Sequence, residues 1–163
     1  MRLITILIIY LLPFSVSAGT ITGNVVRITD GDTLVVLDSN KVQYKIRLVG
    51  IDAPEKKQAY GKKSKDNLSD LVAGKHVVVE YDKLDRYKRI LGKVKLSGED
   101  VNLEQVEAGM AWHYKKYQNE QSQSDRMMYS EAESEARIAK RGLWYDPNPL
   151  PPWDYRRLKK PKP

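Results

Sequence analysis

The order of strand-like and helix-like patterns is the feature that most constrains how this chain can fold. Five short runs of β-branched and apolar residues predict strands at residues 21–29, 33–37, 43–49, 76–81 and 90–96. Residues 59–72 change to helical spacing between the third and fourth runs, and Gly74 follows as a stop. Two more helical patterns come later, one ending near Gly109 and one running from Met128 to Leu143. A parallel α/β sheet needs strict alternation of strands and helices, so this order excludes it.

Five strands with one helix between the third and the fourth match the order of an OB-fold barrel. We therefore expect an α+β, mainly β protein: a five-stranded OB-fold barrel with three packed helices. Hydrophobic residues make up 41% of the 163 residues and charged residues 30%, which is too apolar for a disordered chain and too polar for a membrane bundle. Cysteine is absent, which excludes a disulfide scaffold, a cysteine-ligated zinc site and a thiol nucleophile.

The chain is also basic, with 28 Lys and Arg residues against 21 Asp and Glu residues and a formal net charge of +7. Such an excess favours a polyanionic partner, whether nucleic acid, anionic lipid or an acidic glycan. The alternative is a solvated basic surface that has no partner.

The first eighteen residues have the pattern of a secretory signal peptide. Arg2 gives a short positive start, and residues 3–12 are almost wholly apolar. Val16 and Ala18 suit the −3 and −1 positions of a signal peptidase site. The apolar run is far shorter than the ~20 residues that a membrane-spanning helix needs. We therefore expect cleavage near Ala18-Gly19, a secreted or periplasmic protein and no stable membrane span afterwards; the alternative is an uncleaved anchor.

The composition changes again at residue 146. Six of the eight prolines lie in residues 147–163, together with five Lys and Arg residues. We expect residues 19–145 to form the folded domain and residues 146–163 to form a Pro-rich basic tail with no core of its own. Leu150 and Trp153 are the residues that could attach the first part of this tail to the barrel.

The segment Asp30-Gly31-Asp32-Thr33 lies where the first predicted strand passes to the second. Carboxylates at positions i and i+2 of an extended chain point to the same side. Two like charges this close are unfavourable without a positive charge between them, and a hard divalent cation with oxygen ligands would supply it. A common turn, with no ligand, is the alternative interpretation of this segment alone.

Two more charged segments lie at strand ends. In residues 47–55, Arg47 is expected on the outer face of the third strand, with Asp52 and Glu55 on the turn beyond Gly50. In residues 85–89, arginines that suit a phosphate flank a tyrosine that could donate a hydrogen bond or stack on a base. Solvated acids and a charged hairpin tip are the alternatives for each segment on its own.

These three segments, in this order, resemble the staphylococcal nuclease (thermonuclease) family, as do residues 108–112 and 136–144. The resemblance covers residues 20–145, and the signal-peptide pattern at residues 1–18 agrees with it. It implies an OB-fold barrel with helices around it, and a calcium-dependent phosphodiesterase that acts on DNA and RNA. We expect a monomer. His76 and His113 are isolated in the sequence and are assigned no role.

The resemblance also implies roles for individual residues. Asp32 and Asp52 match the carboxylates that bind Ca²⁺, Ala53 matches the residue that offers a backbone carbonyl, and Asp30 matches an acid that supports them. Arg47 and Arg89 match the arginines that hold the scissile phosphate, and Glu55 matches the glutamate assigned to the attacking water. Tyr87 and Tyr117 match tyrosines that contact the nucleotide, and Arg86, a further expected substrate contact, stands where the best-studied member carries lysine.

The chemistry of these residues agrees with a mechanism that uses one metal ion, because the chain shows no second set of carboxylates. Glu55 is expected to remain free to interact with water. Three features depart from the family pattern: Ala53 replaces a threonine, Lys115 replaces a tyrosine of the nucleotide site, and the loop after Glu55 is shorter.

Two other classes of function remain as alternatives. A non-catalytic OB-fold module could bind single-stranded nucleic acid, although carboxylates at the site would repel phosphate if no metal were bound. An exported adhesion or polyanion-binding protein could use the basic tail.

Overall fold

The computed structural model describes residues 19–159. The expected signal peptide at residues 1–18 and the last four residues of the tail, 160–163, lie outside the described residues. Within the described part, no helix has both the length and the apolar character needed to cross a membrane.

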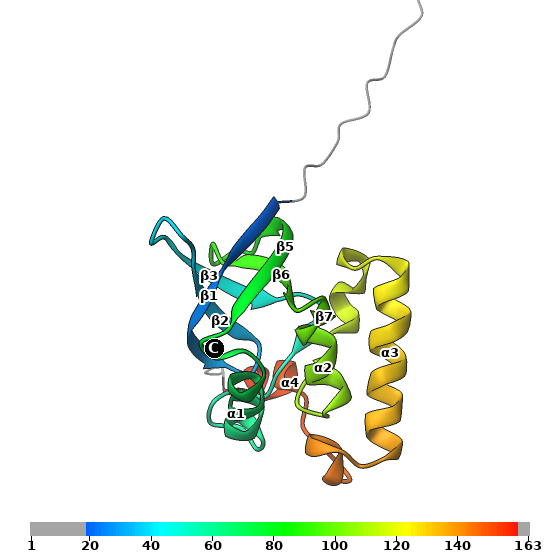
Figure 1. Cartoon of the computed structure of the whole chain (residues 1–163). Helices are drawn as coiled ribbons and strands as arrows, with labels where there is room; N and C mark the ends of the chain where they lie inside the picture. The colour runs from blue at the N-terminus through cyan, green and yellow to red at the C-terminus, as the bar shows by residue number, and fades with distance from the viewer. Residues whose placement is uncertain (1–18, 160–163) are drawn as a thin grey trace, which may run out of the picture.

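Five strands form a closed barrel (Figure 1). They are β1 (Gly19–Asp30), β2 (Thr33–Leu37), β3 (Gln43–Leu48), β5 (His76–Leu84) and β6 (Ile90–Leu96). Neighbouring strands pair in the order β3-β2-β1-β5-β6, and a parallel pairing of β3 with β6, in which Ile46 faces Ile90, closes the barrel. This architecture confirms the predicted OB-fold barrel.

Three short strands were not predicted. β4 (Ile51–Asp52) pairs with β8 (Trp112–His113), and β7 (Glu99–Asp100) pairs with the end of β6. Asp52, which the sequence analysis placed on a turn, therefore lies in a strand and opposite Trp112. Strands of two residues carry no alternation of apolar and polar residues, so the sequence pattern could not reveal them.

Three helices gather below and beside the barrel (Figure 1). They are α1 (Gly61–Val72), α2 (Val101–Glu107) and α3 (Gln123–Ile138). The expected third helix differs most in its bounds: α3 begins at Gln123, where the Ser122 side chain accepts a hydrogen bond from the Asp125 N–H, and it ends at Ile138. Leu143 lies instead in a 3₁₀ helix, η2 (Gly142–Tyr145). A second 3₁₀ helix, η1 (Lys115–Glu120), precedes α3.

The main core fills the barrel and continues between the barrel and the helices. Leu34 and Ile46 from the strands, Leu68 from α1 and Val106 from α2 are fully buried there, together with the Tyr129 ring from α3. This burial of apolar surface is the main force that holds the helices against the barrel. A smaller cluster contains Trp112, Ala136, Leu143 and Trp144.

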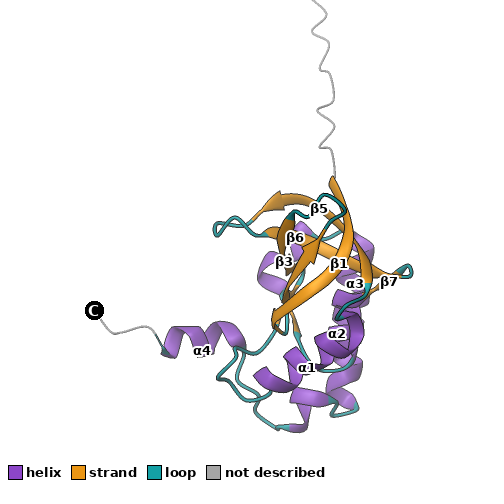
Figure 2. Cartoon of the chain, turned by 60° about the vertical axis from the view of Figure 1, so that its left-hand side comes forward, coloured by secondary structure: helices purple, strands orange, loops and turns teal. Residues whose placement is uncertain are grey.

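The described part of the tail forms one more helix, α4 (Pro152–Leu158), which projects on one side of the molecule (Figure 2). Trp153 stacks on Tyr114, with ring centroids 5.4 Å apart, and meets Trp112 edge to face at 5.5 Å. The Leu150 side chain is 41% exposed, but its carbonyl accepts a hydrogen bond from Gln58. Trp153 and the carbonyl of Leu150 thus both attach the first part of the tail to the domain.

Candidate active site

One cleft of about 570 Å³ lies at the end of the barrel, between the β5–β6 hairpin and α4. Every residue that the sequence analysis assigned to the site lines this cleft. They are Asp30, Asp32, Arg47, Asp52, Ala53, Glu55, Arg86, Tyr87, Arg89 and Tyr117. Segments that are far apart in the chain therefore present their charged side chains to a single space.

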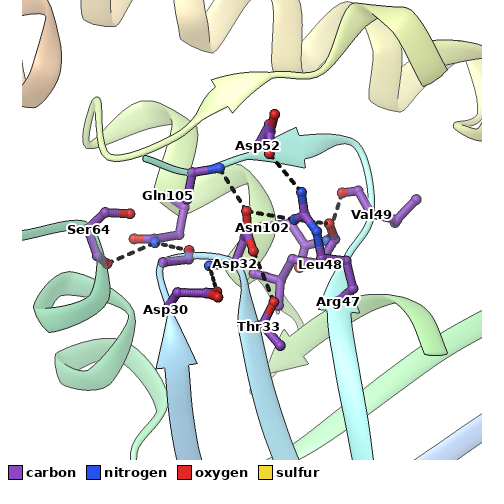
Figure 3. A network of polar contacts seen from close by, with 12 residues as sticks. Asp30, Asp32, Thr33, Arg47, Leu48, Val49, Asp52, Ser64, Asn102 and Gln105 are labelled. Carbon is purple, nitrogen blue, oxygen red and sulfur yellow. Dashed lines mark hydrogen bonds and ion pairs between the residues drawn. The ribbon is translucent and has the colours of Figure 1, made fainter. Parts of the chain in front are cut away.

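The turn between β1 and β2 carries the first pair of carboxylates (Figure 3). Gly31 fits against α1 so closely that a Cβ atom there would lie 1.8 Å from the Ser64 hydroxyl oxygen. From α2, the buried Gln105 amide donates to the carbonyls of Gly31 and Ser64. The turn that presents Asp30 and Asp32 is thus held from behind by two helices.

Arg47 joins two carboxylates from different segments, the β1–β2 turn and the short strand β4 (Figure 3). Its Nη1 lies 2.8 Å from Asp32 Oδ2, and its Nη2 lies 2.9 Å from Asp52 Oδ1. The neighbours Ile46 and Leu48 are buried in the core, so the alternation of the strand directs Arg47 away from the core and into the cleft. Its side chain is only 12% exposed, because the two carboxylates cover it.

The chain bends sharply after β3 to bring Asp52 into this arrangement. Gly50 adopts φ = 78°, a left-handed conformation that glycine accepts without strain. The buried Asn102 side chain of α2 donates to the carbonyls of Val49 and Gly92 and so fixes the start of the bend (Figure 3). The N–H of Ala53 donates to Asp32 Oδ2 over 2.8 Å, which locks the peptide of Ala53 against the first carboxylate pair.

Burial and nearby negative charge raise the pKa of two carboxylates of the site, Asp30 and Asp52. Burial, followed by the charge of the adjacent Asp32, raises the pKa of Asp30 to about 6. Burial also raises the pKa of Asp52, although Arg156 and Arg47 oppose that increase. Carboxylates in such surroundings favour an additional positive charge close by.

The β5–β6 hairpin supplies the second arginine, Arg89, which directly precedes β6, the strand that pairs with the strand of Arg47. The Asp85 carboxylate accepts hydrogen bonds from Arg89 Nε at 2.7 Å and from the N–H groups of Tyr87 and Arg89. Burial would raise the pKa of Asp85, but these bonds to Arg89 and Tyr87 outweigh it and lower the pKa. Arg89 Nη1 also lies 3.5 Å from the hydroxyl of Thr33, so its guanidinium points toward the β1–β2 turn.

Glu55 differs from its expected state. Its carboxylate accepts a hydrogen bond from Arg156 of α4, with Nη1 at 2.8 Å from Oε1, so it is not free of partners. The same guanidinium donates to both oxygens of Asp52. The sequence analysis counted Arg156 only as one of several tail charges, and no sequence pattern distinguished it from its neighbours.

Aromatic residues stand on both sides of the cleft. Tyr87 is 64% exposed at the hairpin tip, with the guanidinium of Arg86 4.8 Å from its ring centroid. On the other side, Tyr117 meets Tyr114 edge to face at 5.0 Å. Tyr114 also lines the cleft, and the sequence analysis missed it. The family resemblance placed the nucleotide-site position at Lys115, but Lys115 pairs instead with the buried Glu133.

The donor set fits a hard divalent cation. Asp32 and Asp52 already place oxygen atoms around one positive group, the Arg47 guanidinium, and the Ala53 peptide lies against them. Among residues 19–159, no three His, Cys, Asp or Glu side chains lie close enough to share a metal ion. A cation here would therefore depend on two carboxylates, a backbone carbonyl and water, which is a set of oxygen ligands suited to Ca²⁺.

A cleft at the end of an OB-fold barrel that brings paired carboxylates together with arginines from two neighbouring strands is typical of proteins that cleave phosphodiester bonds. The family model described as staphylococcal nuclease homologue matches residues 45–146. The chain belongs to this family and is a nuclease.

Several known proteins are similar to this chain in sequence over most of their length and most of its length. A protein of Escherichia coli named "Uncharacterized endonuclease" is 47% identical over 154 residues, which are 94% of this chain and 96% of that relative. A protein of the same name from Haemophilus influenzae is 42% identical, with 97% of this chain and 85% of the relative covered. A protein of Shigella flexneri named "Micrococcal nuclease" is 42% identical, with 85% and 82% covered.

Proposed function

We propose that this nuclease hydrolyses phosphodiester bonds of DNA and RNA in a calcium-dependent reaction within the cleft. One observation carries the proposal: Asp32 and Asp52 converge on Arg47 in the same cleft that receives Arg89 and Glu55. A surface that only bound nucleic acid would gain nothing from three carboxylates, since each repels phosphate.

Asp32, Asp52 and the backbone carbonyl of Ala53 are the proposed ligands of one Ca²⁺ ion. Asp30 lies beside them, and its Oδ1 accepts the N–H of Asp32 at 3.3 Å, which supports the turn that presents the ligands. When bound, calcium supplies Lewis acidity toward a phosphate oxygen.

The two arginines would bind the scissile phosphate from different sides. Arg47 pairs here with Asp32 and Asp52 and would turn toward the phosphate when these carboxylates bind calcium. Arg89 is held by Asp85, so its guanidinium need not reorganise when negative charge develops on the non-bridging oxygens. Donors that are held in place in this way contribute most in the transition state. Glu55 would accept a hydrogen bond from the attacking water and orient it toward phosphorus.

The nucleotides beside the scissile bond would lie along the walls of the cleft. Arg86 and Tyr87 are exposed on the hairpin, where they can contact a phosphate or a base. Tyr117 offers a partly exposed ring on the other wall, supported by Tyr114.

We also propose export, supported by the positive start, apolar run and small residues of the first eighteen positions. Mass spectrometry of the protein recovered outside the cytoplasm should show an N-terminus at Gly19. A membrane-bound chain with Met1 intact would mean that the segment is an anchor.

We further propose that the protein is a monomer, so light scattering should show a single peak at the monomer mass.

The experiment that tests the function is degradation of denatured DNA, duplex DNA and RNA, each in calcium and in excess chelator. We expect cleavage of both DNA and RNA in calcium and none in chelator. Retention of these polymers without cleavage in calcium would instead support the non-catalytic OB-fold module.

A further inference from the structure

The C-terminal helix places a guanidinium on two of the residues that the proposed reaction needs. Arg156 Nη2 lies 2.7 Å from Asp52 Oδ2, and its Nη1 lies 3.2 Å from Asp52 Oδ1 and 2.8 Å from Glu55 Oε1. Asp52 is a proposed calcium ligand and Glu55 is the proposed partner of water. One tail side chain therefore occupies the acceptor atoms of both.

Packing of α4 holds this arginine in place. Trp153, three residues earlier, stacks on Tyr114 with the ring planes 11° apart and contacts Trp112 edge to face. The Tyr155 hydroxyl donates to the carbonyl of Lys57 at 3.1 Å. These contacts fix the helix on Tyr114, on Trp112 of β8 and on the loop that follows Glu55, so Arg156 does not reach the cleft as a free end.

The contacts of Arg156 conflict with cation binding at Asp52. Asp52 Oδ1 accepts from both Arg47 and Arg156, and Oδ2 accepts from Arg156, so both oxygens are already in use. The Asp52 side chain is 1% exposed, which leaves it little freedom to turn another face to a ligand. A divalent cation and a guanidinium on the same carboxylate also repel each other strongly in buried surroundings.

We propose that Arg156 competes with calcium for Asp52. Without calcium, the docked helix α4 keeps Arg156 on Asp52 and Glu55; when calcium binds, Arg156 is displaced and α4 is released. We call this arrangement the latch. This inference rests on the calcium site of the proposed function. Below the calcium concentration needed for displacement, Arg156 holds both Asp52 and Glu55. Because coupling between two binding events is reciprocal, calcium weakens the docking of α4 by the same factor by which α4 weakens calcium binding.

Isothermal titration of calcium chloride into the full-length protein tests the latch. Arg156→Gln should bind calcium at least about 5-fold more tightly than the wild type, the lower end of common coupling between sites. Arg157→Gln is the matched control: it removes the same charge from the same helix, but Arg157 is 76% exposed at its side chain and pairs with Asp154. Its calcium affinity should equal that of the wild type.

Hydrogen exchange provides a second measurement that does not depend on activity or on a substitution. In the wild type, backbone amides of residues 152–158 should exchange faster in calcium than in chelator, while amides of α3 should not change. The melting temperature of each variant confirms that it is folded.

The possible results separate the latch from the function on which it rests. Equal calcium affinity of Arg156→Gln and Arg157→Gln, or weaker binding by Arg156→Gln, overturns the latch and leaves the calcium site intact. An unchanged calcium affinity with a raised KM for denatured DNA makes Arg156 a substrate contact and also overturns it. No calcium binding by any of the three proteins overturns the calcium site, and the latch with it.

Discussion

Arg47 bridges Asp32 and Asp52, with Nη1 2.8 Å from one carboxylate and Nη2 2.9 Å from the other. The bridge joins the β1–β2 turn to the short strand β4, so a proposed phosphate-binding arginine and the proposed cation ligands form one unit. A substitution at any of the three positions therefore affects both the geometry of the carboxylates and the reception of the phosphate.

Turnover should require the guanidinium groups of Arg47 and Arg89, and a lysine at either position should not replace them. Arg47→Lys and Arg89→Lys should each lower kcat by ~10²-fold or more, since one preorganised donor is worth about 3 kcal/mol in the transition state. Lysine keeps the charge but lacks the planar fork that reaches two acceptors. Steady-state kinetics on denatured DNA measures kcat and KM for each variant.

Arg27→Lys is the control for these substitutions, because Arg27 is exposed on β1 and has no ion pair within residues 19–159. It should retain the kinetic constants of the wild type. A raised KM with unchanged kcat at Arg47 or Arg89 would make these arginines phosphate anchors without a role in the chemical step.

His113 should make the stability of the protein depend on pH. It is 2% exposed, its Nε2 bonds to Gln121, and its Nδ1 has no hydrogen-bond partner within the described part of the chain. Burial lowers the pKa of His113, and the nearby Lys115 acts in the same direction, whereas Gln121 and Glu133 oppose it. The neutral ring is thus favoured in the folded state.

The unfolded chain then binds the proton more readily, so the contribution of His113 to the free energy of unfolding should fall as the pH decreases below about 6.5. The raised pKa of Asp30 acts in the opposite direction, but this contribution is the same in the wild type and in both histidine variants. Urea unfolding between pH 5 and pH 8 measures this. His113→Gln should flatten that part of the profile, whereas His76→Gln, at an exposed position on β5, should not. The same slope in both variants would contradict the assignment to His113.

Trp153 should stabilise the fold, although it lies in the tail. Trp153→Ala removes a stacked contact with Tyr114 and an edge contact with Trp112, which should cost ~1–3 kcal/mol. Thermal and urea unfolding measure the loss, and Leu158→Ala, 74% exposed on the same helix, should show little change. Equal stability of the two variants would mean that α4 contributes nothing to the folded domain.

The barrel was predictable because its strands are short runs of β-branched and apolar residues. The bounds of β2 and β6 agree with the expected residues 33–37 and 90–96. In β6 the buried residues alternate with partly exposed ones, whereas residues 33–36 of β2 are all buried. The position of Gly74 after α1 was also readable, and it adopts φ = 72° there. Local patterns of this kind depend only on neighbours in the chain.

Other parts of the site depend on contacts between distant residues. Asp52 lies in a strand because it pairs with Trp112, sixty residues later, and no local pattern predicts that pairing. Arg156 enters the cleft because Trp153 stacks on Tyr114 and so docks α4 there. In the tail sequence nothing distinguishes Arg156 from the other basic residues. Docking of this kind is decided by packing, so composition alone could not select Arg156.

The most direct test of the calcium site is the rate of cleavage of denatured DNA as a function of calcium concentration, for the wild type and Asp32→Ala. Asp66→Ala is the matched control, because Asp66 is an exposed carboxylate on α1. We expect calcium-activated cleavage by the wild type and by Asp66→Ala, both abolished by chelator. Asp32→Ala should remain folded and show no calcium-activated cleavage. Full activity of the wild type in excess chelator, or calcium-activated cleavage by Asp32→Ala at the wild-type rate, would contradict the account.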